Sequence, residues 1–196
     1  QLNAEDGGSR KFIMVQLPEA TDEGGTAYRA GYRNICEIGK ERIRRAGAKI
    51  AAEAGEKAAG LDLGFRCLRL DTSNMTDVYY APDAVTQDGL FAQVDNVKAD
   101  RTPEDLLIQT MLDLGIPLSA SIAVEEIAGK RVFNVADGFL LACFDRDVTD
   151  ETVTAIAKRK PYYAVFRDAS MADDSALTNF DQLFAAYSPS TVRKVL

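Results

Sequence analysis

The chain has 196 residues, of which 46% are hydrophobic and 27% are charged. This composition excludes a disordered chain, a collagen-like repeat and a disulfide scaffold, and no apolar run approaches the roughly 20 residues that span a bilayer. The net charge of −7 is divided into +1 over residues 1–60 and −8 over residues 61–196, so the longer part lacks the clustered positive charge of a nucleic-acid footprint.

The first ten residues predict the end of a helix. Leu2 and Ala4 are its apolar residues, and Gly7 and Gly8 are its stop signal. The chain opens at Gln1 without a methionine, a basic region or an apolar signal region. We therefore expect neither a signal peptide nor a natural translation start, and we expect the chain to begin inside a longer protein.

A strand, a helix and a second strand are predicted next. The strand Lys11–Leu17 is a short apolar run, typical of a strand buried on both faces of a parallel sheet. Small and apolar residues then recur at steps of three or four over residues 35–54, with Asn34 as the N-cap of a helix. The second strand, Leu61–Leu70, alternates apolar and polar residues. Together these elements predict one crossover unit of an α/β fold.

A loop rich in Asp, Ser, Asn and Pro, residues 71–83, predicts a domain boundary. A helix is predicted over Thr86–Lys98. A clearer helix begins after Thr102, a natural N-cap followed by Pro103, and ends at Gly115. Its predicted core face consists of Leu106, Leu107, Thr110, Met111 and Leu114.

The remaining residues predict strands followed by alternating helices and strands. Strands at Ile122–Ile127 and Arg131–Val135 flank a turn, and the strand Gly138–Phe144 is apolar throughout and should be central. The predicted later elements are a helix capped by Asp150 and ending near Lys158, a strand at Tyr162–Asp168, a helix at Asp174–Tyr187 and a tail or edge strand at Thr191–Leu196.

The histidine and cysteine content of the chain excludes several kinds of catalytic and metal site. The chain has no histidine, which excludes a Ser-His-Asp or Cys-His nucleophile and a histidine zinc site within it. Its three cysteines are odd in number and far apart, which favours a reducing, cytoplasmic compartment. Cys36, Cys67 and Cys143 have apolar neighbours and are expected to be buried rather than reactive.

Two charged clusters are candidate sites. The carboxylates of Asp168, Asp173 and Asp174 follow a predicted strand end, where they would bind a metal ion or cap the next helix; capping is favoured and no metal is predicted. The basic helix face Lys40–Lys49 would contact phosphate or be a solvated face paired with its interleaved glutamates. The second reading is favoured, because Glu41 and Arg45 have the spacing of an ion pair.

Several long segments carry a resemblance to a known family. They are RKFIMVQLPE (residues 10–19), YRNICEIGKERIRR (32–45), LGFRCLRLDTSN (63–74), QVDNVKADRTPEDLL (93–107), EIAGKRV (126–132) and VFRDASMADD (165–174). In these segments the chain resembles the modification subunit of type III restriction–modification systems, a DNA adenine methyltransferase.

The resemblance implies a fold and a division into domains. Residues 1–75 would be part of a Rossmann-like methyltransferase sheet, and residues 84–196 a small, acidic, mixed α/β assembly domain. The family's catalytic Asp-Pro-Pro-Tyr motif and its Phe-x-Gly-x-Gly-Thr-Thr cofactor loop do not occur in this chain. The resemblance therefore implies a C-terminal fragment with no catalytic residue and no activity of its own.

The family reaction transfers a methyl group from S-adenosylmethionine to the exocyclic amine of adenine in duplex DNA, which requires extraction of the base from the stack. A polar group near the end of the second strand of such a sheet contacts the cofactor ribose. By the family pattern this group is Gln16, where relatives commonly have Glu, or else Glu19. The alternative is that Gln16 only pairs backbone in a sheet and that Glu19 is a solvated loop carboxylate.

The resemblance also implies partners. They are duplex DNA, a restriction subunit and a second modification subunit in a homodimer. A rival hypothesis is a free-standing, non-catalytic α/β protein-interaction module. A third is an unrelated small enzyme that uses the carboxylates between Asp168 and Asp174.

Overall fold

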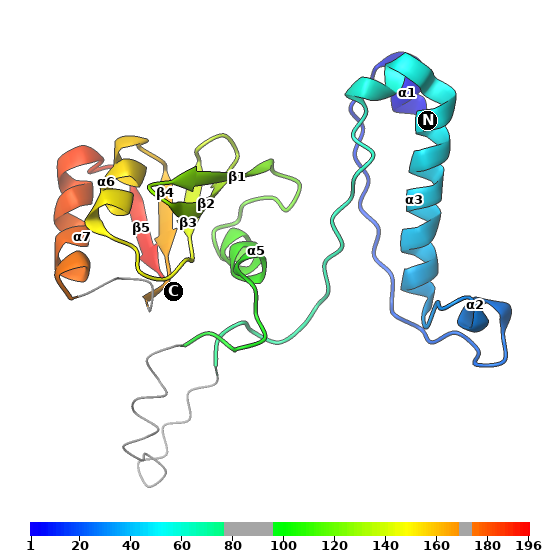
Figure 1. Cartoon of the computed structure of the whole chain (residues 1–196), viewed down its shortest axis with the longest axis horizontal. Coiled ribbons are helices and arrows are strands. Elements are labelled where there is room, and N and C mark those ends of the chain that lie inside the picture. Colours follow the sequence, from blue (N-terminus) through cyan, green and yellow to red (C-terminus); the bar gives the residue numbers. More distant parts are fainter. Residues whose placement is uncertain (77–95, 169–173) are drawn as a thin grey trace, which may run out of the picture. The chain divides into compact units, whose positions relative to one another are not determined.

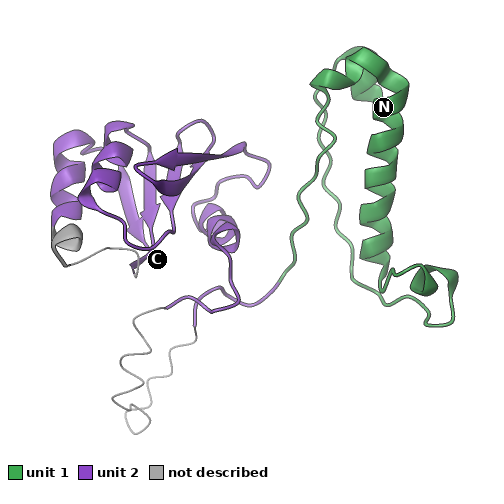
Figure 2. Ribbon diagram, viewed as in Figure 1, with its two compact units in different colours: residues 1–70 green, residues 71–196 purple. Residues whose placement is uncertain are grey.

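The computed structural model describes residues 1–76, 96–168 and 174–196, and of residues 174–178 only the backbone. The chain divides into two compact units, Gln1–Leu70 and Asp71–Leu196 (Figure 2). Each unit is described by itself. The helix expected at Thr86–Lys98 falls mostly outside the described residues, and at its end Val97 forms an isolated antiparallel bridge with Met75.

The first unit is helical. Helix α1 (Leu2–Asp6) ends at Gly7, whose φ of 69° is the left-handed cap that glycine favours, and α2 (Thr26–Arg29) is a single turn. Helix α3 (Ile35–Ala54) continues into the 3-10 helix η1 (Gly55–Gly60). The Asn34 side chain accepts a hydrogen bond from the Glu37 amide at 3.1 Å, which confirms the predicted N-cap.

The two strands predicted for this unit are wrong. Residues 11–17 and 61–70 contain no helix or strand, although Ala20 and Asn34 form an isolated bridge nearby. The Ile13 and Val15 side chains are 88% and 93% exposed, and no helix of this unit contains a buried residue. An apolar run supplies strand propensity, but a strand also needs a neighbouring backbone to pair with, and the described part of this unit offers none. The predicted crossover unit and Rossmann-like sheet are therefore absent from the described residues.

The second unit is a mixed α/β fold around one five-stranded sheet. The sheet order follows the chain: β1 (Ile122–Ile127), β2 (Lys130–Val135), β3 (Leu140–Cys143), β4 (Tyr163–Phe166) and β5 (Val192–Val195). The first three strands are antiparallel, whereas β3, β4 and β5 are parallel. The parallel strands are connected by helices α6 (Asp150–Lys158) and α7 (Asp174–Tyr187). The predicted strands and the central place of β3 are confirmed.

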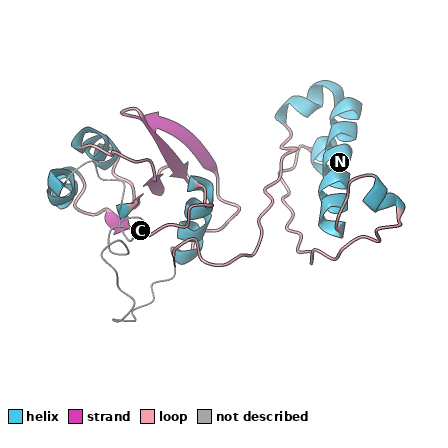
Figure 3. Cartoon of the chain, turned by 60° about the horizontal axis from the view of Figure 1, so that its bottom comes forward, coloured by secondary structure: helices cyan, strands magenta, loops and turns pink. Residues whose placement is uncertain are grey.

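Helices lie on both faces of this sheet (Figures 1 and 3). On one face, Leu106, Leu107 and Met111 of α5 (Pro103–Asp113) pack against a cluster that includes Phe133 and Val165. On the other face, residues of α6 and α7 form a second cluster. Since all four residues of β3 are buried, this strand contributes to both layers of the core.

The ends of the helices follow their local sequence. Thr102 accepts a hydrogen bond from the Asp105 amide, and the Asp105 carboxylate accepts one from the Thr102 amide at 2.8 Å, which completes a capping box before α5. The hydrogen bonds that the Asp105 carboxylate accepts from the Thr102 amide and from the Thr102 hydroxyl lower the pKa of Asp105. The expected Asp150 cap is wrong by one residue: Thr149 is the N-cap, and Asp150 opens α6, where its charge favours the positive end of the helix.

The β1–β2 turn carries backbone strain at one residue. Ile127 pairs with Lys130, so the turn has two central residues, Ala128 and Gly129, with φ of 49° and 73°. A two-residue hairpin with both φ values positive favours Asn-Gly, and alanine in this region loses roughly 1 kcal/mol.

We expect Ala128→Asn to raise the free energy of unfolding by about 0.5–1 kcal/mol, because asparagine tolerates this backbone conformation. Ala128 is exposed, so the new side chain meets no packed core. Chemical denaturation of the two proteins measures the difference. Ala123→Asn, at an exposed position on β1, is the control and should give no gain; equal gains from both substitutions would contradict the explanation.

Candidate functional site

The residues proposed to contact a cofactor lie before helix α3. The side chains of Gln16 and Glu19 are exposed. The Ile35 amide donates to the Glu19 carbonyl at 3.0 Å, and the Cys36 thiol donates to the carbonyls of Gln16 and Leu17 at 3.6 and 3.5 Å. These contacts fix residues 16–19 to the first turn of α3. The sequence pointed to both residues, but it did not predict this attachment to the helix.

The basic face of α3 is largely neutralised by its own glutamates. Arg45 donates to Glu41 at 2.7 Å, Lys40 to Glu37 at 2.5 Å, and Lys49 lies 3.7 Å from Glu53. The hydrogen bond with Glu37 raises the pKa of Lys40, and the one with Glu41 raises the pKa of Arg45. The predicted Glu41–Arg45 pair is confirmed. A face paired in this way has little net charge to offer a phosphate backbone.

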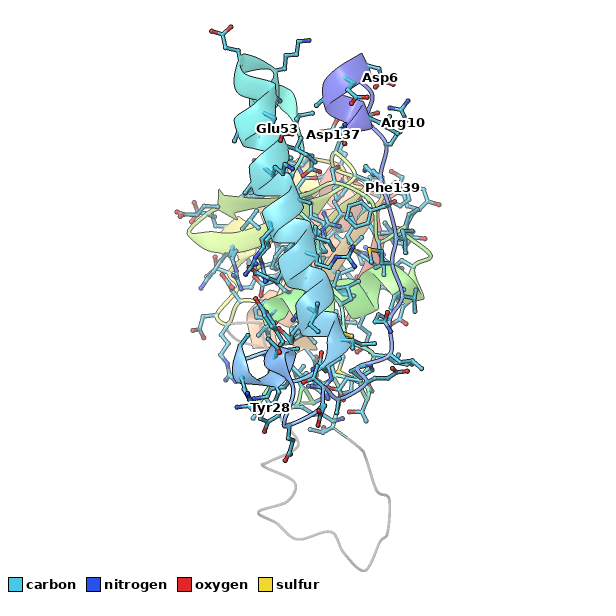
Figure 4. The ribbon with its side chains drawn as sticks, turned by 90° about the vertical axis from the view of Figure 1, so that its right-hand side faces the viewer. Asp6, Arg10, Tyr28, Glu53, Asp137 and Phe139 are labelled. Atoms are coloured by element: carbon cyan, nitrogen blue, oxygen red, sulfur yellow. The ribbon has the colours of Figure 1, made fainter. Side chains whose placement is uncertain are left out.

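Another exposed ion pair lies at the C-terminal end of α1. Arg10 donates to Asp6 at 2.6 Å, and Figure 4 shows the two side chains together beside the helix. The hydrogen bond from Arg10 lowers the pKa of Asp6. Since both side chains are about half exposed, this pair serves local structure.

The predicted acidic cluster is only partly described. The Asp168 amide donates to the Leu196 carbonyl at 2.9 Å, which extends the β4–β5 pairing, whereas Asp173 and the Asp174 side chain lie outside the described residues. In the described part of the chain, no three carboxylate, cysteine or histidine side chains gather as metal ligands, and no helix is long and apolar enough to cross a membrane.

The three cysteines are unpaired and differ in exposure. Cys143 is fully buried in β3, as expected, and burial raises the pKa of its thiol to about 11. Cys36 is partly buried, while Cys67 is exposed, so its predicted burial is wrong. Cys67 belongs to the segment 61–70, which forms no strand, so no sheet covers its side chain.

A cluster of aromatic rings is the most distinctive surface of the second unit. Phe139, which precedes β3, stacks on Tyr162, which precedes β4, with ring centroids 5.0 Å apart and ring planes 8° apart. Tyr163 meets both rings edge-on, at 5.5 and 4.8 Å. Phe139 and Tyr162 are nevertheless 41% and 54% exposed. We call these three residues the aromatic face.

The aromatic face borders an open hollow of about 670 Å³. Its other walls come from the chain after α5 and from the β2–β3 turn, and they include Ile116, Pro117, Ala120 and Ala136. Exposed aromatic rings beside an apolar hollow are typical of a binding surface. This site was not predicted from the sequence; the adjacent tyrosines Tyr162 and Tyr163, at the start of a predicted strand, were the available signal.

A network of hydrogen bonds and an ion pair stabilises the turn that carries Phe139. Asn134 accepts a hydrogen bond from the Gly138 amide at 2.6 Å and donates to Glu125 at 2.7 Å, and Glu125 also forms an ion pair with Arg159. The hydrogen bond from Asn134, followed by that from Arg159, lowers the pKa of Glu125 below its usual 4.5. The carboxylate therefore links β1, β2 and the end of α6.

This shift predicts a pH dependence of stability. Because the pKa of Glu125 is lower in the folded state, its contribution is complete above pH 4.5 and is lost as the pH falls through the folded value. We expect Glu125→Gln to lower stability at neutral pH and to make the loss of stability below pH 4.5 less steep. Thermal unfolding across this pH range is the measurement. Glu126→Gln, at the exposed neighbouring position, is the control, and an unchanged pH profile for Glu125→Gln would contradict the assignment.

Comparison with known proteins adds a relationship in sequence. No protein-family model matches the chain. The StyLTI Mod subunit of a type III restriction-modification enzyme from Salmonella typhimurium is 45% identical over 71 residues, which are 36% of this chain and 11% of that protein. The EcoPI Mod subunit of a type III restriction-modification enzyme from Escherichia phage P1 is 36% identical over 67 residues, which are 34% of this chain and 10% of that protein.

The matched part of the chain thus spans about a tenth of the length of these curated relatives. Identity of 45% over 71 residues is too high and too long for a shared composition or a common secondary-structure pattern. The expected resemblance to the modification subunit of type III restriction–modification systems is thereby confirmed over about a third of the chain.

Proposed function

We propose that this chain is part of a site-specific DNA adenine methyltransferase, the modification subunit of a type III restriction–modification system. The observation that carries the proposal is the 45% identity of 71 of its residues, 36% of the chain, with a type III modification subunit. In the proposed parent protein, S-adenosylmethionine supplies the methyl group and adenine in duplex DNA receives it at its exocyclic amine. The proposed setting is the cytoplasm, which agrees with three unpaired cysteines.

Within this chain, Gln16 and Glu19 are the proposed contacts to the cofactor ribose. A carboxylate or amide oxygen accepts hydrogen bonds from ribose hydroxyls, so both residue types suit this role. Their side chains are exposed, and the carbonyls of the segment accept hydrogen bonds from the Ile35 amide and the Cys36 thiol, which hold it in place. Gln16 is matched to the position where related enzymes commonly have Glu but carries a neutral amide, whereas Glu19 has a carboxylate and lies three residues further along the chain.

The chain alone should transfer no methyl group to DNA. It lacks the Asp-Pro-Pro-Tyr motif and the Phe-x-Gly-x-Gly-Thr-Thr loop, so the pocket for an extracted adenine is missing. Incubation with radiolabelled S-adenosylmethionine and duplex DNA tests this expectation, with an empty-vector preparation as the control. Methylation above that control, abolished by Gln16→Ala with Glu19→Ala, would show that the chain itself holds a working site.

Residues 71–196 are the proposed assembly unit of the parent protein. This unit has 11 Lys and Arg against 20 Asp and Glu, a net charge of −9, which favours a protein partner over DNA. A restriction subunit and a second modification subunit are the proposed partners. Co-purification of the chain with a separately tagged restriction subunit tests the assembly role, and a basic protein of similar size is the control for charge alone.

A second candidate function is a free-standing protein-interaction module without catalysis. The exposed aromatic rings of Phe139 and Tyr162 favour it, because they offer a binding surface that needs no catalytic motif. The two proposals require different coding sequences upstream of Gln1. A modification subunit requires the two methyltransferase motifs upstream of Gln1, and a free-standing module requires neither.

A further inference from the structure

We propose that the aromatic face binds an extended, proline-containing segment of a protein partner, with basic residues beside the proline. The inference rests on the assembly role proposed for residues 71–196 and gives that role a surface and a partner chemistry. The aromatic face consists of Phe139, Tyr162 and Tyr163, at the ends where β3 and β4 begin. Figure 4 shows Phe139 and Asp137, both from the turn that leads into β3.

The rings are held in position before any partner binds. The Tyr163 amide donates to the Phe139 carbonyl at 2.8 Å, and the Val192 amide donates to the Tyr162 carbonyl at 2.8 Å. Gly138 is fixed by its hydrogen bond to Asn134. These bonds attach both aromatic segments to the sheet, so little conformational freedom remains to be lost on binding.

The shape and chemistry of the hollow suit an extended proline-containing segment. Its walls combine the flat rings of Phe139 and Tyr162 with Pro117 and small apolar side chains. Among the described residues, neither tyrosine hydroxyl of the aromatic face has a hydrogen-bond partner, so both hydroxyls are available to a partner's carbonyl groups. Grooves lined with aromatic rings recognise polyproline segments in this way, since such a segment is extended before it binds and leaves its carbonyls free.

The surrounding charges favour a basic partner over a nucleic acid. Asp113 and Asp137 are exposed, and each is next in the sequence to a residue that lines the hollow, Leu114 and Ala136. The cations nearby in sequence are mostly engaged: Arg159 pairs with Glu125, and Lys158 lies 5.0 Å from the centre of the Tyr187 ring. Lys160 is exposed, and its single charge is outweighed by the two carboxylates. A nucleic-acid surface would need several free cations beside its aromatic rings.

The test measures peptide binding by the full chain with fluorescence anisotropy. The probe is the fluorescein-labelled peptide Arg-Pro-Leu-Pro-Pro-Arg. One control peptide has alanine in place of each proline, and another has glutamate in place of each arginine. We expect saturable binding of the probe, weaker binding of both control peptides, and a loss of about 10-fold or more with Tyr162→Ala.

Val124→Ala is the matched control variant, because Val124 is 58% exposed on β1, outside the aromatic face. It should bind the probe as the unchanged chain does. Tyr162→Phe keeps the ring and removes one hydroxyl donor, so its affinity should lie between those of Tyr162→Ala and the unchanged chain. A cooperative thermal transition for each variant shows that it is folded.

Absence of saturable binding, or equal affinity for the probe and both control peptides, would overturn the proposal. The proposal would also be overturned if a labelled oligothymidylate bound more tightly than the peptide and Tyr162→Ala abolished that binding. The aromatic face would then be a nucleic-acid surface. Because the assay needs neither methylation nor a restriction subunit, its failure would leave the proposed function standing. The proposed function is tested separately: it would fail if the reading frame upstream of Gln1 encoded neither methyltransferase motif.

Discussion

Phe166→Ala is expected to remove about 3–5 kcal/mol from the free energy of unfolding of residues 71–196. Phe166 is fully buried at the end of β4 and meets Phe180 and Phe184 edge-on, with ring centroids 5.2 and 6.4 Å away. Truncation leaves a cavity between the sheet and α7, which the surrounding helices fill only in part. Since a small domain has only about 5–15 kcal/mol of stability, a substantial part of the stability of this unit would be lost.

Tyr162→Ala is the matched control for this substitution. It removes a ring of similar size beside the same strand, but Tyr162 is 54% exposed. Loss of its stacking on Phe139 should cost about 1 kcal/mol. Urea denaturation followed by circular dichroism compares the two variants. Equal destabilisation by both would mean that the core between β4 and α7 is not packed as described.

Amide hydrogens of residues 11–17 should exchange with solvent at least about a thousandfold faster than those of β3 in the same chain. The apolar side chains from Phe12 to Val15 are 59–93% exposed, and no strand pairs with them. The amides of β3 lie in a fully buried strand with hydrogen-bonded neighbours on both sides. Hydrogen exchange read by mass spectrometry measures both segments in one experiment.

The same exposed segment should make the chain self-associate. A contiguous exposed run of Phe, Ile, Met and Val is an aggregation hazard when it is not paired. Light scattering should show association that Ile13→Lys with Val15→Lys reduces, whereas Leu68→Lys with Leu70→Lys is a comparison in the other unpaired segment. A monomer with full protection of residues 12–15 would contradict the structure of the first unit.

Local sequence predicted the second unit well. Thr102 and Pro103 mark the beginning of α5, and the apolar run before Phe144 identified the central strand. These features depend on neighbours in the chain, so they can be read from the sequence. The positive φ of Ala128 could not be predicted, because alanine gives no local signal for that conformation.

The first unit shows where such reasoning fails. Lys11–Leu17 has the pattern of a buried strand, yet it forms no strand in the structure and its apolar side chains are exposed. Helix α3 was predicted because its signals are local: the Asn34 N-cap and the recurrence of small and apolar residues at steps of three or four. A strand depends on contacts that are distant in sequence, and apolar periodicity alone does not specify them.

The candidate sites divide in the same way. The paired basic face of α3 could be predicted from the spacing of its charges. The aromatic face could not, because Phe139 lies 23 residues before Tyr162 and meets it only when β3 and β4 pair in parallel. The ribose contacts proposed for Gln16 and Glu19 come from the family resemblance and remain to be tested.

The most direct test of the proposed function is the sequence of the reading frame upstream of the codon for Gln1. We predict that it encodes Phe-x-Gly-x-Gly-Thr-Thr shortly before Gln1 and Asp-Pro-Pro-Tyr further upstream. That result would place this chain in the C-terminal part of a type III modification methyltransferase. A start codon immediately before Gln1, or a long upstream frame with neither motif, would contradict the proposal and leave the free-standing interaction module as the function to test.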